Sequence, residues 1–197
     1  VATDGHRLSY ASGAVARQDE KREVILPRKA ILELARLLTE GDENVAIELY
    51  ASQVKFCFGT IELSTKIIDG KFPDYTRVIP VNYEKHIMLD RLLLLQALQR
   101  AAILSNEKFR GVRWMLTGNS LRISCTNNEQ EEAQEELEVA YAGDALDVGF
   151  NITYLLDVLN NVSSQRIDCA FGDANSSMLI TLPDRSDYRY VVMPMRI

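Results

Sequence analysis

The chain repeats one structural pattern three times, and this repeat restricts the possible folds more than any other feature. Each copy is a short apolar stretch, typical of a β-strand, that leads directly into an amphipathic helical pattern, at residues 24–39, 86–104 and 148–162. The predicted helices start at Pro27, Asp90 and Asn151, which are residue types common at helix starts. These starts lie 63 and 61 residues apart. The near-constant spacing indicates a repeated unit rather than three unrelated helices.

The apolar residues of the three predicted helices occupy equivalent positions. At four, five, eight and eleven residues beyond each start, all twelve residues are apolar, which is the spacing of one helix face. These residues are Ile31, Leu32, Ala35 and Leu38, then Leu94, Leu95, Leu98 and Ala101, then Leu155, Leu156, Leu159 and Val162. We therefore expect each helix to bury this face against a sheet.

Three strand-like segments follow each predicted helix. They lie at 45–50, 54–58 and 61–67, at 112–116, 121–125 and 136–141, and at 166–171, 178–182 and 190–193. The repeated unit is thus a strand, a helix and three strands, which predicts an α+β fold. Because one such unit buries too little surface to be stable alone, we expect two units per domain. We place a domain boundary near residues 80–84 and interpret residues 1–15 as the closing strands of a further unit.

Composition excludes several classes of protein. The 197 residues are 47% hydrophobic and 25% charged, which is enough for a substantial core, and they contain no apolar run long enough to span a membrane. Three widely spaced cysteines and two histidines form neither a zinc module nor a disulfide framework, so we expect no metal and no cofactor. The first residues include neither an initiator Met nor a signal region, so we expect a fragment of a longer cytoplasmic chain.

The search for catalytic chemistry yields one weak candidate. Asp4 and His6 lie two residues apart and could act as a carboxylate and an imidazole on one face of a strand. An Asp-Gly turn explains the same residues more simply. We therefore expect no active site and no enzymatic activity.

Charge is informative through its distribution. The chain has 22 Lys and Arg against 28 Asp and Glu, a net charge of −6, which at first opposes binding to nucleic acid. Arg28 and Lys29 nevertheless stand at the start of a predicted helix, where positive charge opposes the helix dipole. A phosphate contact and a solvated helix start both remain open for this pair. The apolar tail around Met193 and Met195 likewise fits either a core strand or an adaptable binding surface.

Four motifs across almost the whole chain resemble the bacterial DNA polymerase III beta subunits, the sliding clamps. They are TDGHRL at 3–8, KFPDY at 71–75, SNEKFRG at 105–111 and VVMPMR at 191–196. The resemblance implies the DNA-clamp fold, with two units per domain. It also implies a three-domain subunit that dimerises head to tail into a ring around duplex DNA. Residues 1–84 would be the C-terminal half of the middle domain, and 85–197 the complete last domain.

The family resemblance also implies a function. The ring would be a non-catalytic processivity factor that slides on DNA, and a groove between the two domains would bind short peptides, of a Gln-Leu-x-Leu-Phe type, from DNA polymerases, the clamp loader and repair proteins. Carried onto this sequence, one wall of the groove would be Thr3, Gly5, His6, Arg7, Leu8, Pro73, Arg77 and Val78. The other wall would be Asn151, Tyr154, Ser177, Val191, Met193, Pro194, Met195 and Arg196.

Helices would line the bore of such a ring. DNA contacts would fall to Arg28, Lys29, Arg36 and Arg100. The dimer interface would include Ile103 and Leu104, with its partner surface on the missing first domain, so we expect this fragment to be monomeric. The sequence departs from the family pattern at Thr76, Asn175 and Ile197, so its peptide preference would differ in detail.

Two other classes of function fit parts of the sequence. A peptide-binding scaffold without DNA would share the groove, but charge reversal at Arg28 and Lys29 in the full-length protein would leave its function unchanged. An enzyme that uses Asp4 and His6 would lose turnover on His6→Ala, whereas a groove residue would lose only peptide affinity.

Overall fold

The computed structural model describes residues 1–15, 22–38 and 44–197, and these divide into two compact units. Unit 1 consists of Val1–Ala14 and Tyr75–Ile197, and unit 2 is drawn from Val15–Asp74. The first residues of the chain therefore join the C-terminal part rather than the segment that follows them. The predicted domain boundary at residue 84 stays a prediction, since compact units of this chain need not coincide with the domains of a longer protein.

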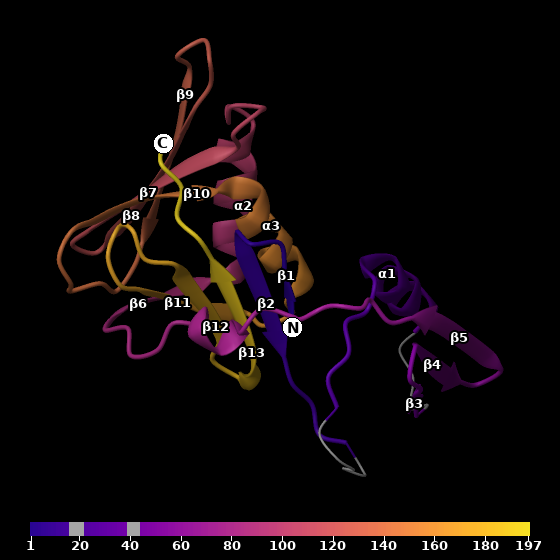
Figure 1. Cartoon of the computed structure of the whole chain (residues 1–197). Coiled ribbons are helices and arrows are strands. Elements are labelled where there is room, and N and C mark those ends of the chain that lie inside the picture. Colours follow the sequence, from indigo (N-terminus) through magenta and orange to yellow (C-terminus); the bar gives the residue numbers. More distant parts are fainter. Residues whose placement is uncertain (16–21, 39–43) are drawn as a thin grey trace. The chain divides into compact units, whose positions relative to one another are not determined.

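Unit 1 contains two antiparallel sheets and two helices (Figure 1). In spatial order, the six-stranded sheet is β1 (Ala2–Thr3), β2 (Arg7–Ala11), β13 (Arg185–Val192), β12 (Met178–Leu182), β11 (Arg166–Phe171) and β6 (Lys85–Asp90). The four-stranded sheet is β10 (Leu146–Asn151), β7 (Gly111–Thr117), β8 (Ser120–Thr126) and β9 (Glu132–Glu138). The helices are α2 (Arg91–Ala102) and α3 (Ile152–Asn161), and a short 3-10 helix, η1, spans Tyr75–Arg77.

The two sheets and two helices of unit 1 share one hydrophobic core, centred on residues such as Trp114 and Phe150. The predicted inner face of α2 is buried at all four positions, and that of α3 is buried at three, with Leu156 partly buried against the same core. The predicted repeat of a strand, a helix and three strands is also present twice within unit 1, as β6-α2-β7-β8-β9 and as β10-α3-β11-β12-β13. These predictions are confirmed.

Side-chain caps begin both of these helices. The Asp90 carboxylate accepts hydrogen bonds from the backbone N–H groups of Leu92 and Leu93 at 2.9 and 3.0 Å, and Asn151 Oδ1 accepts one from Thr153 at 2.9 Å. Each cap satisfies donors that lack a partner within the helix. The helix starts predicted at residues 90 and 151 are therefore confirmed.

Unit 2 has the predicted helix after Pro27 and the three predicted strands, but it departs from the sequence prediction in two respects. It contains α1 (Arg28–Leu37) and a sheet of β3 (Ala46–Leu49), β4 (Gln53–Phe58) and β5 (Ile61–Lys66), but the extended segment 24–27 joins no sheet among the described residues. The predicted inner face of α1 is wrong as well, since Ile31 and Leu32 are 43% and 54% exposed. Residue 39 of the predicted helix lies outside the described residues.

The exposure of this face has a physical cause. In unit 1, each helix is covered by sheet residues and by the other helix, so a wide apolar face is buried. In unit 2, a single three-stranded sheet covers only one flank of α1, where Leu34 and Leu37 pack against the cluster of Val54, Phe56 and Phe58. Within the described residues of unit 2, nothing covers the remaining apolar face of α1.

Candidate functional site

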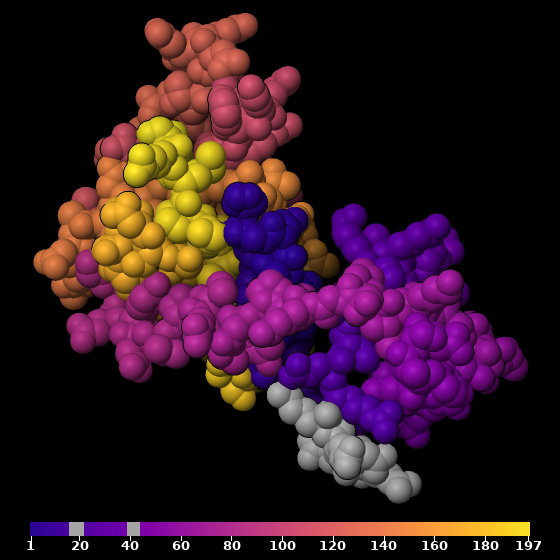
Figure 2. All heavy atoms as spheres, viewed as in Figure 1, coloured from indigo at the N-terminus to yellow at the C-terminus, as the bar shows by residue number. Residues whose placement is uncertain are grey.

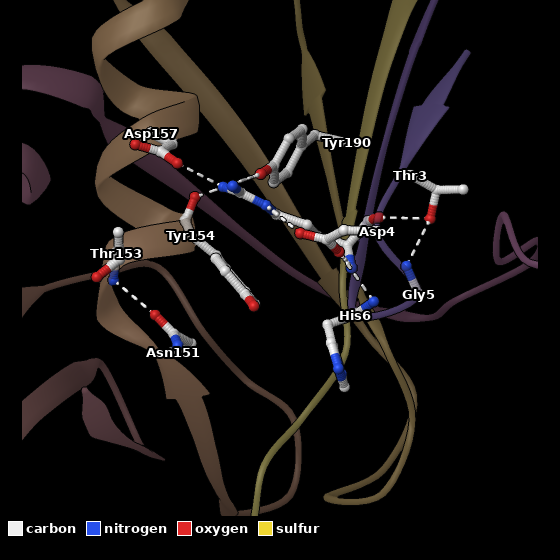
Figure 3. A network of polar contacts seen from close by, with 10 residues as sticks. Thr3, Asp4, Gly5, His6, Asn151, Thr153, Tyr154, Asp157 and Tyr190 are labelled. Atoms are coloured by element: carbon white, nitrogen blue, oxygen red, sulfur yellow. Dashed lines mark hydrogen bonds and ion pairs between the residues drawn. The ribbon is translucent and has the colours of Figure 1, made fainter. Parts of the chain in front are cut away.

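The turn between β1 and β2 is built by its own polar side chains (Figure 3). Thr3 Oγ1 donates to the backbone carbonyl of Arg7 at 2.7 Å and accepts from the N–H of Gly5 at 3.2 Å. Asp4 Oδ1 accepts from the N–H groups of His6 and Arg7 at 3.0 and 3.1 Å. Gly5 has a φ of 88°, in the left-handed region that favours glycine. This turn engages Asp4 with the backbone and with Arg7, rather than with the His6 imidazole.

Strand pairing brings this hairpin to the far end of the chain. In the antiparallel pair of β2 and β13, Leu8 lies opposite Val191 and Arg7 lies opposite Val192. One residue further, the N–H of Met193 donates to the carbonyl of His6 at 2.9 Å. Figure 2 shows the N-terminal hairpin and the C-terminal residues side by side on one face of unit 1. We call residues 3–8 and 191–196, together with Tyr154 of α3, the hairpin–tail surface.

Arg7 connects the hairpin to α3. Its Nη1 lies 2.5 Å from Asp157 Oδ2 and donates to the Tyr190 hydroxyl at 3.3 Å, and its Nε lies 3.0 Å from Asp4 Oδ2. The guanidinium carbon lies 4.2 Å from the centroid of the Tyr154 ring, which is a cation–π contact. The side chain is 27% exposed, and these partners hold it in one position.

The same contacts shift the pKa values of the charged partners. Partial burial disfavours the charged Arg7, but hydrogen bonds to Asp157, Tyr190 and Asp4 outweigh it and raise the pKa of Arg7. Burial likewise opposes the charge on Asp4, but hydrogen bonds from His6 and Arg7 lower the pKa of this carboxyl group. Arg7 and Asp4 therefore carry opposite charges near neutral pH, which stabilises the turn.

The hairpin–tail surface has a buried base and an exposed apolar rim. Leu8 and Val191 are 2% and 1% exposed and form a cluster with Ile79, so they lie beneath the surface. Met193 is 45% exposed, and Pro194 and Met195 are half-buried. An adaptable thioether beside fixed polar groups is suited to holding an apolar side chain of a ligand.

The other residues predicted for the groove are more dispersed. Asn151 caps α3, Ser177 directly precedes β12, and Val78 follows η1 with 43% of its surface exposed. Arg77 is the last residue of η1, and Arg196 is exposed. Pro73 belongs to unit 2.

The residues predicted to contact DNA differ in their surroundings. Arg28 and Lys29 are exposed in the first turn of α1 and form no ion pair with any described residue. On the same helix, Arg36 pairs with Glu33 at 2.7 Å. Arg100 of α2 donates two hydrogen bonds to Glu135, at 2.7 and 2.6 Å, and these raise the pKa of the guanidinium group. A phosphate would have to compete with a carboxylate for Arg36 and for Arg100.

The two residues predicted for the dimer interface directly follow α2. Ile103 is 78% exposed, which is the highest value among the large apolar residues of the described chain, and Leu104 is half-buried. The exposed Phe109 follows in the next loop. An apolar side chain so fully in water favours contact with another surface.

Sequence reasoning missed several residues that support this site. Asp157 and Tyr190 hold Arg7, and Asp4, which the sequence placed in an Asp-Gly turn, also binds Arg7 through its side chain. The spacing of Tyr154 and Asp157 on one helix face could have indicated a shared partner. Nothing local could have identified that partner as Arg7, which lies 150 residues away in the chain.

Other kinds of site find little support in the part of the chain that the structure describes. It contains no group of His, Cys, Asp and Glu residues that could hold a metal ion, and no helix long and apolar enough to cross a membrane. Two surface hollows lie away from the hairpin–tail surface. One is lined by Asn119 and 138–140, and the other by 84–86 and 141–143.

Comparison with known proteins places the whole chain in one family. Residues 76–196 match the C-terminal domain of the DNA polymerase III beta subunit, and residues 1–74 match its central domain. The beta sliding clamps of Pseudomonas aeruginosa and Escherichia coli K12 are 48% and 44% identical over all of this chain. The chain covers 54% of each, so it spans about half the length of these curated relatives.

Solved structures agree with this result. A Pseudomonas aeruginosa sliding clamp bound to griselimycin has a TM-score of 0.94 and 48% identity, covering 100% of this chain and 53% of that one. The C. crescentus beta sliding clamp has the same TM-score at 38% identity, and the match covers 100% of this chain and 52% of that one. The predicted α+β clamp fold is thereby confirmed. From the two family matches, the identities and the shared fold, we conclude that this chain belongs to the DNA polymerase III beta subunit family, the beta sliding clamps.

Proposed function

We propose that this chain is part of a DNA polymerase processivity factor, a non-catalytic subunit that acts in the cytoplasm as a ring around duplex DNA. The observation that carries the proposal is the pairing of residues 3–8 with residues 191–196, two of the motifs typical of the family, on one surface. This surface binds short peptide motifs of DNA polymerases, the clamp loader and repair proteins. The proposed peptide groove consists of the sixteen residues predicted from the sequence, including those that lie outside the hairpin–tail surface.

The chemistry of the hairpin–tail surface supports peptide binding. Exposed Met193 offers an apolar contact that can adapt to its ligand, and Tyr154 offers an aromatic one. Because Arg7 is already held by two carboxylates, its position is set before a ligand arrives, which lowers the entropic cost of binding. A related clamp from Pseudomonas aeruginosa has been solved bound to griselimycin, so a member of the family binds a small ligand.

Titration of a labelled Gln-Leu-x-Leu-Phe peptide tests this surface. We expect saturable binding to the chain, and about tenfold weaker binding by Met193→Ala, since a central apolar anchor typically contributes this much. Met88→Ala is the matched control, because Met88 is 41% exposed on β6, at the opposite edge of the same sheet. No saturable binding by the parent chain, or equal losses in both variants, would contradict the proposal.

Contacts with DNA form the second part of the proposal. Arg28 and Lys29 supply positive charge at an exposed helix start, and Arg36 and Arg100 contribute after exchange of their carboxylate partners. Such phosphate contacts carry no sequence information, which suits a ring that must slide. The net charge of −6 does not oppose this function, because a closed ring holds DNA by its topology.

Charge reversal tests the DNA contacts in the full-length protein. We expect Arg28→Glu with Lys29→Glu to reduce retention on circular DNA and to lower its salt dependence. Arg166→Glu, a reversal at an exposed position on β11, is the control. A double variant that holds DNA as well as the control would favour a peptide-binding scaffold that does not use DNA.

Ring closure forms the third part. Exposed Ile103, with Leu104, contacts a partner subunit in the full-length homodimer. This chain alone remains monomeric, and a tight closed dimer in analytical ultracentrifugation would overturn that expectation.

A further inference from the structure

Residues 195–197 lie against β10, the edge strand of the four-stranded sheet. In β10, Val148 and Phe150 point into the core, with 3% and 0% of their surface exposed. Because side chains alternate along a strand, Gly149 between them faces the opposite side. At the free edge of β10, the N–H of Met195 donates to the carbonyl of Gly149 at 2.8 Å, in an isolated antiparallel bridge.

Gly149 allows this close approach because it has no side chain. A Cβ atom at Gly149 would lie 2.5 Å from both Ile197 Cγ1 and the Met195 carbonyl oxygen, closer than real Cβ contacts. A Cβ at Gly111 of the neighbouring strand β7 would lie 3.5 Å from Ile197 Cδ1, an ordinary contact distance. Gly149 is not among the residues with positive φ, so the backbone conformation does not require glycine there. The requirement comes from the tail that packs on it.

The tail is therefore anchored on both sides of its exposed residues. On one side, the N–H of Met193 donates to His6 of the hairpin, and on the other, the N–H of Met195 donates to Gly149. Met193 and Pro194 lie between these points, and Met193 remains 45% exposed. A short segment with two fixed ends has few conformations to lose when a ligand binds.

We propose that Gly149 and Ile197 form a latch that positions Met193 and Pro194 and thereby sets the affinity of the hairpin–tail surface for peptides. This inference rests on the proposed peptide-binding function. Gly149 is a positioning residue, since it acts through the tail and not by touching the peptide. The Ile197 side chain lies over the two glycines and remains 70% exposed.

Gly149→Ala tests the latch, and Gly13→Ala is its matched control. A Cβ at Gly13 meets no atom within 4 Å, and Gly13 has no positive φ, so the control adds the same methyl group without a clash. Two readouts are needed: hydrogen exchange at the amides of Met193 and Met195, and titration with the labelled Gln-Leu-x-Leu-Phe peptide. In Gly149→Ala, we expect faster exchange at both amides and about tenfold weaker peptide binding. We expect neither change in Gly13→Ala.

Ile197→Ala provides a second variant that introduces no clash into β10. It removes the latch side chain but leaves the Met195–Gly149 bridge, so faster exchange at Met195 and a smaller loss of peptide affinity are expected. This variant decides the matter if Gly149→Ala fails to fold.

Two results overturn the latch. One is that the Met195 amide exchanges at the rate of the parent chain in both Gly149→Ala and Ile197→Ala. The other is that exchange becomes faster while the affinity for the peptide stays unchanged. If the parent chain binds no peptide, the proposed function fails and control of affinity fails with it, while the exchange rates still decide whether Gly149 and Ile197 hold the tail.

Discussion

Replacing Arg7 by Met removes a charge that joins the N-terminal hairpin to α3, while keeping an unbranched apolar chain. The two carboxylate partners, Asp4 and Asp157, are 45% and 50% exposed, so water screens each pair and each contributes about 0.2–1 kcal/mol. The contact with Tyr154 contributes about 0.5–1 kcal/mol, and the hydrogen bond to Tyr190 a similar amount. We therefore expect Arg7→Met to lower the free energy of unfolding of unit 1 by about 2 kcal/mol.

Urea unfolding followed by Trp114 fluorescence measures this loss. Trp114 is the only tryptophan of the chain and is buried in the core of unit 1, so its emission reports that unit and not unit 2. With a typical slope of about 2 kcal/mol per molar urea, a loss of about 2 kcal/mol moves the midpoint by about 1 M.

Two further variants test the reasoning. Arg189→Met removes an exposed arginine that contacts the Tyr10 ring on the neighbouring strand, at 5.7 Å, and we expect it to cost about 0.5 kcal/mol. Arg7→Lys retains the charge but loses the planar guanidinium group, so an intermediate loss is expected. A midpoint for Arg7→Met no lower than that for Arg189→Met would refute the proposed role of Arg7.

Two predictions concern local interactions in unit 1, with the same fluorescence readout. Asp90→Ala should lower the free energy of unfolding of unit 1 by about 1 kcal/mol through loss of the α2 cap. Asp90→Asn should keep most of this stabilisation, because Asn can also accept the cap hydrogen bonds. Equal losses in the two variants would contradict the capping role. The hydrogen bond between His86 and Asp168, 2.9 Å long, raises the pKa of His86. Protonated His86 therefore stabilises unit 1 fully below about pH 6.5, and this stabilisation is lost as the pH rises through the raised pKa of His86. His86→Gln should therefore destabilise the unit more at pH 5.5 than at pH 9, and a pH-independent loss would contradict this assignment.

Local sequence signals predicted most of unit 1. The helices start at Asp90 and Asn151 as expected, because short polar side chains can satisfy the free N–H groups of the first turn. The inner faces of α2 and α3 follow the apolar spacing, because both sheets and both helices surround them. The same spacing failed for α1, where no described residue of unit 2 covers Ile31 and Leu32. Amphipathic spacing predicts an apolar face, but not which part of it is covered.

The repeated pattern, the caps and the four family motifs can be read from short stretches of the chain, since each depends on residues within one or two helical turns or one strand. Three features of the candidate site depend on the tertiary structure: the pairing of Leu8 with Val191, the contacts of Arg7 with Asp157, and the seat of Ile197 on Gly149. Residues 8 and 191 lie at opposite ends of the sequence, and no local propensity encodes which distant strand a strand will meet. In this structure β2 and β13 are joined by their backbone pairing and by the cluster of Leu8, Val191 and Ile79, which brings two motifs together as one surface.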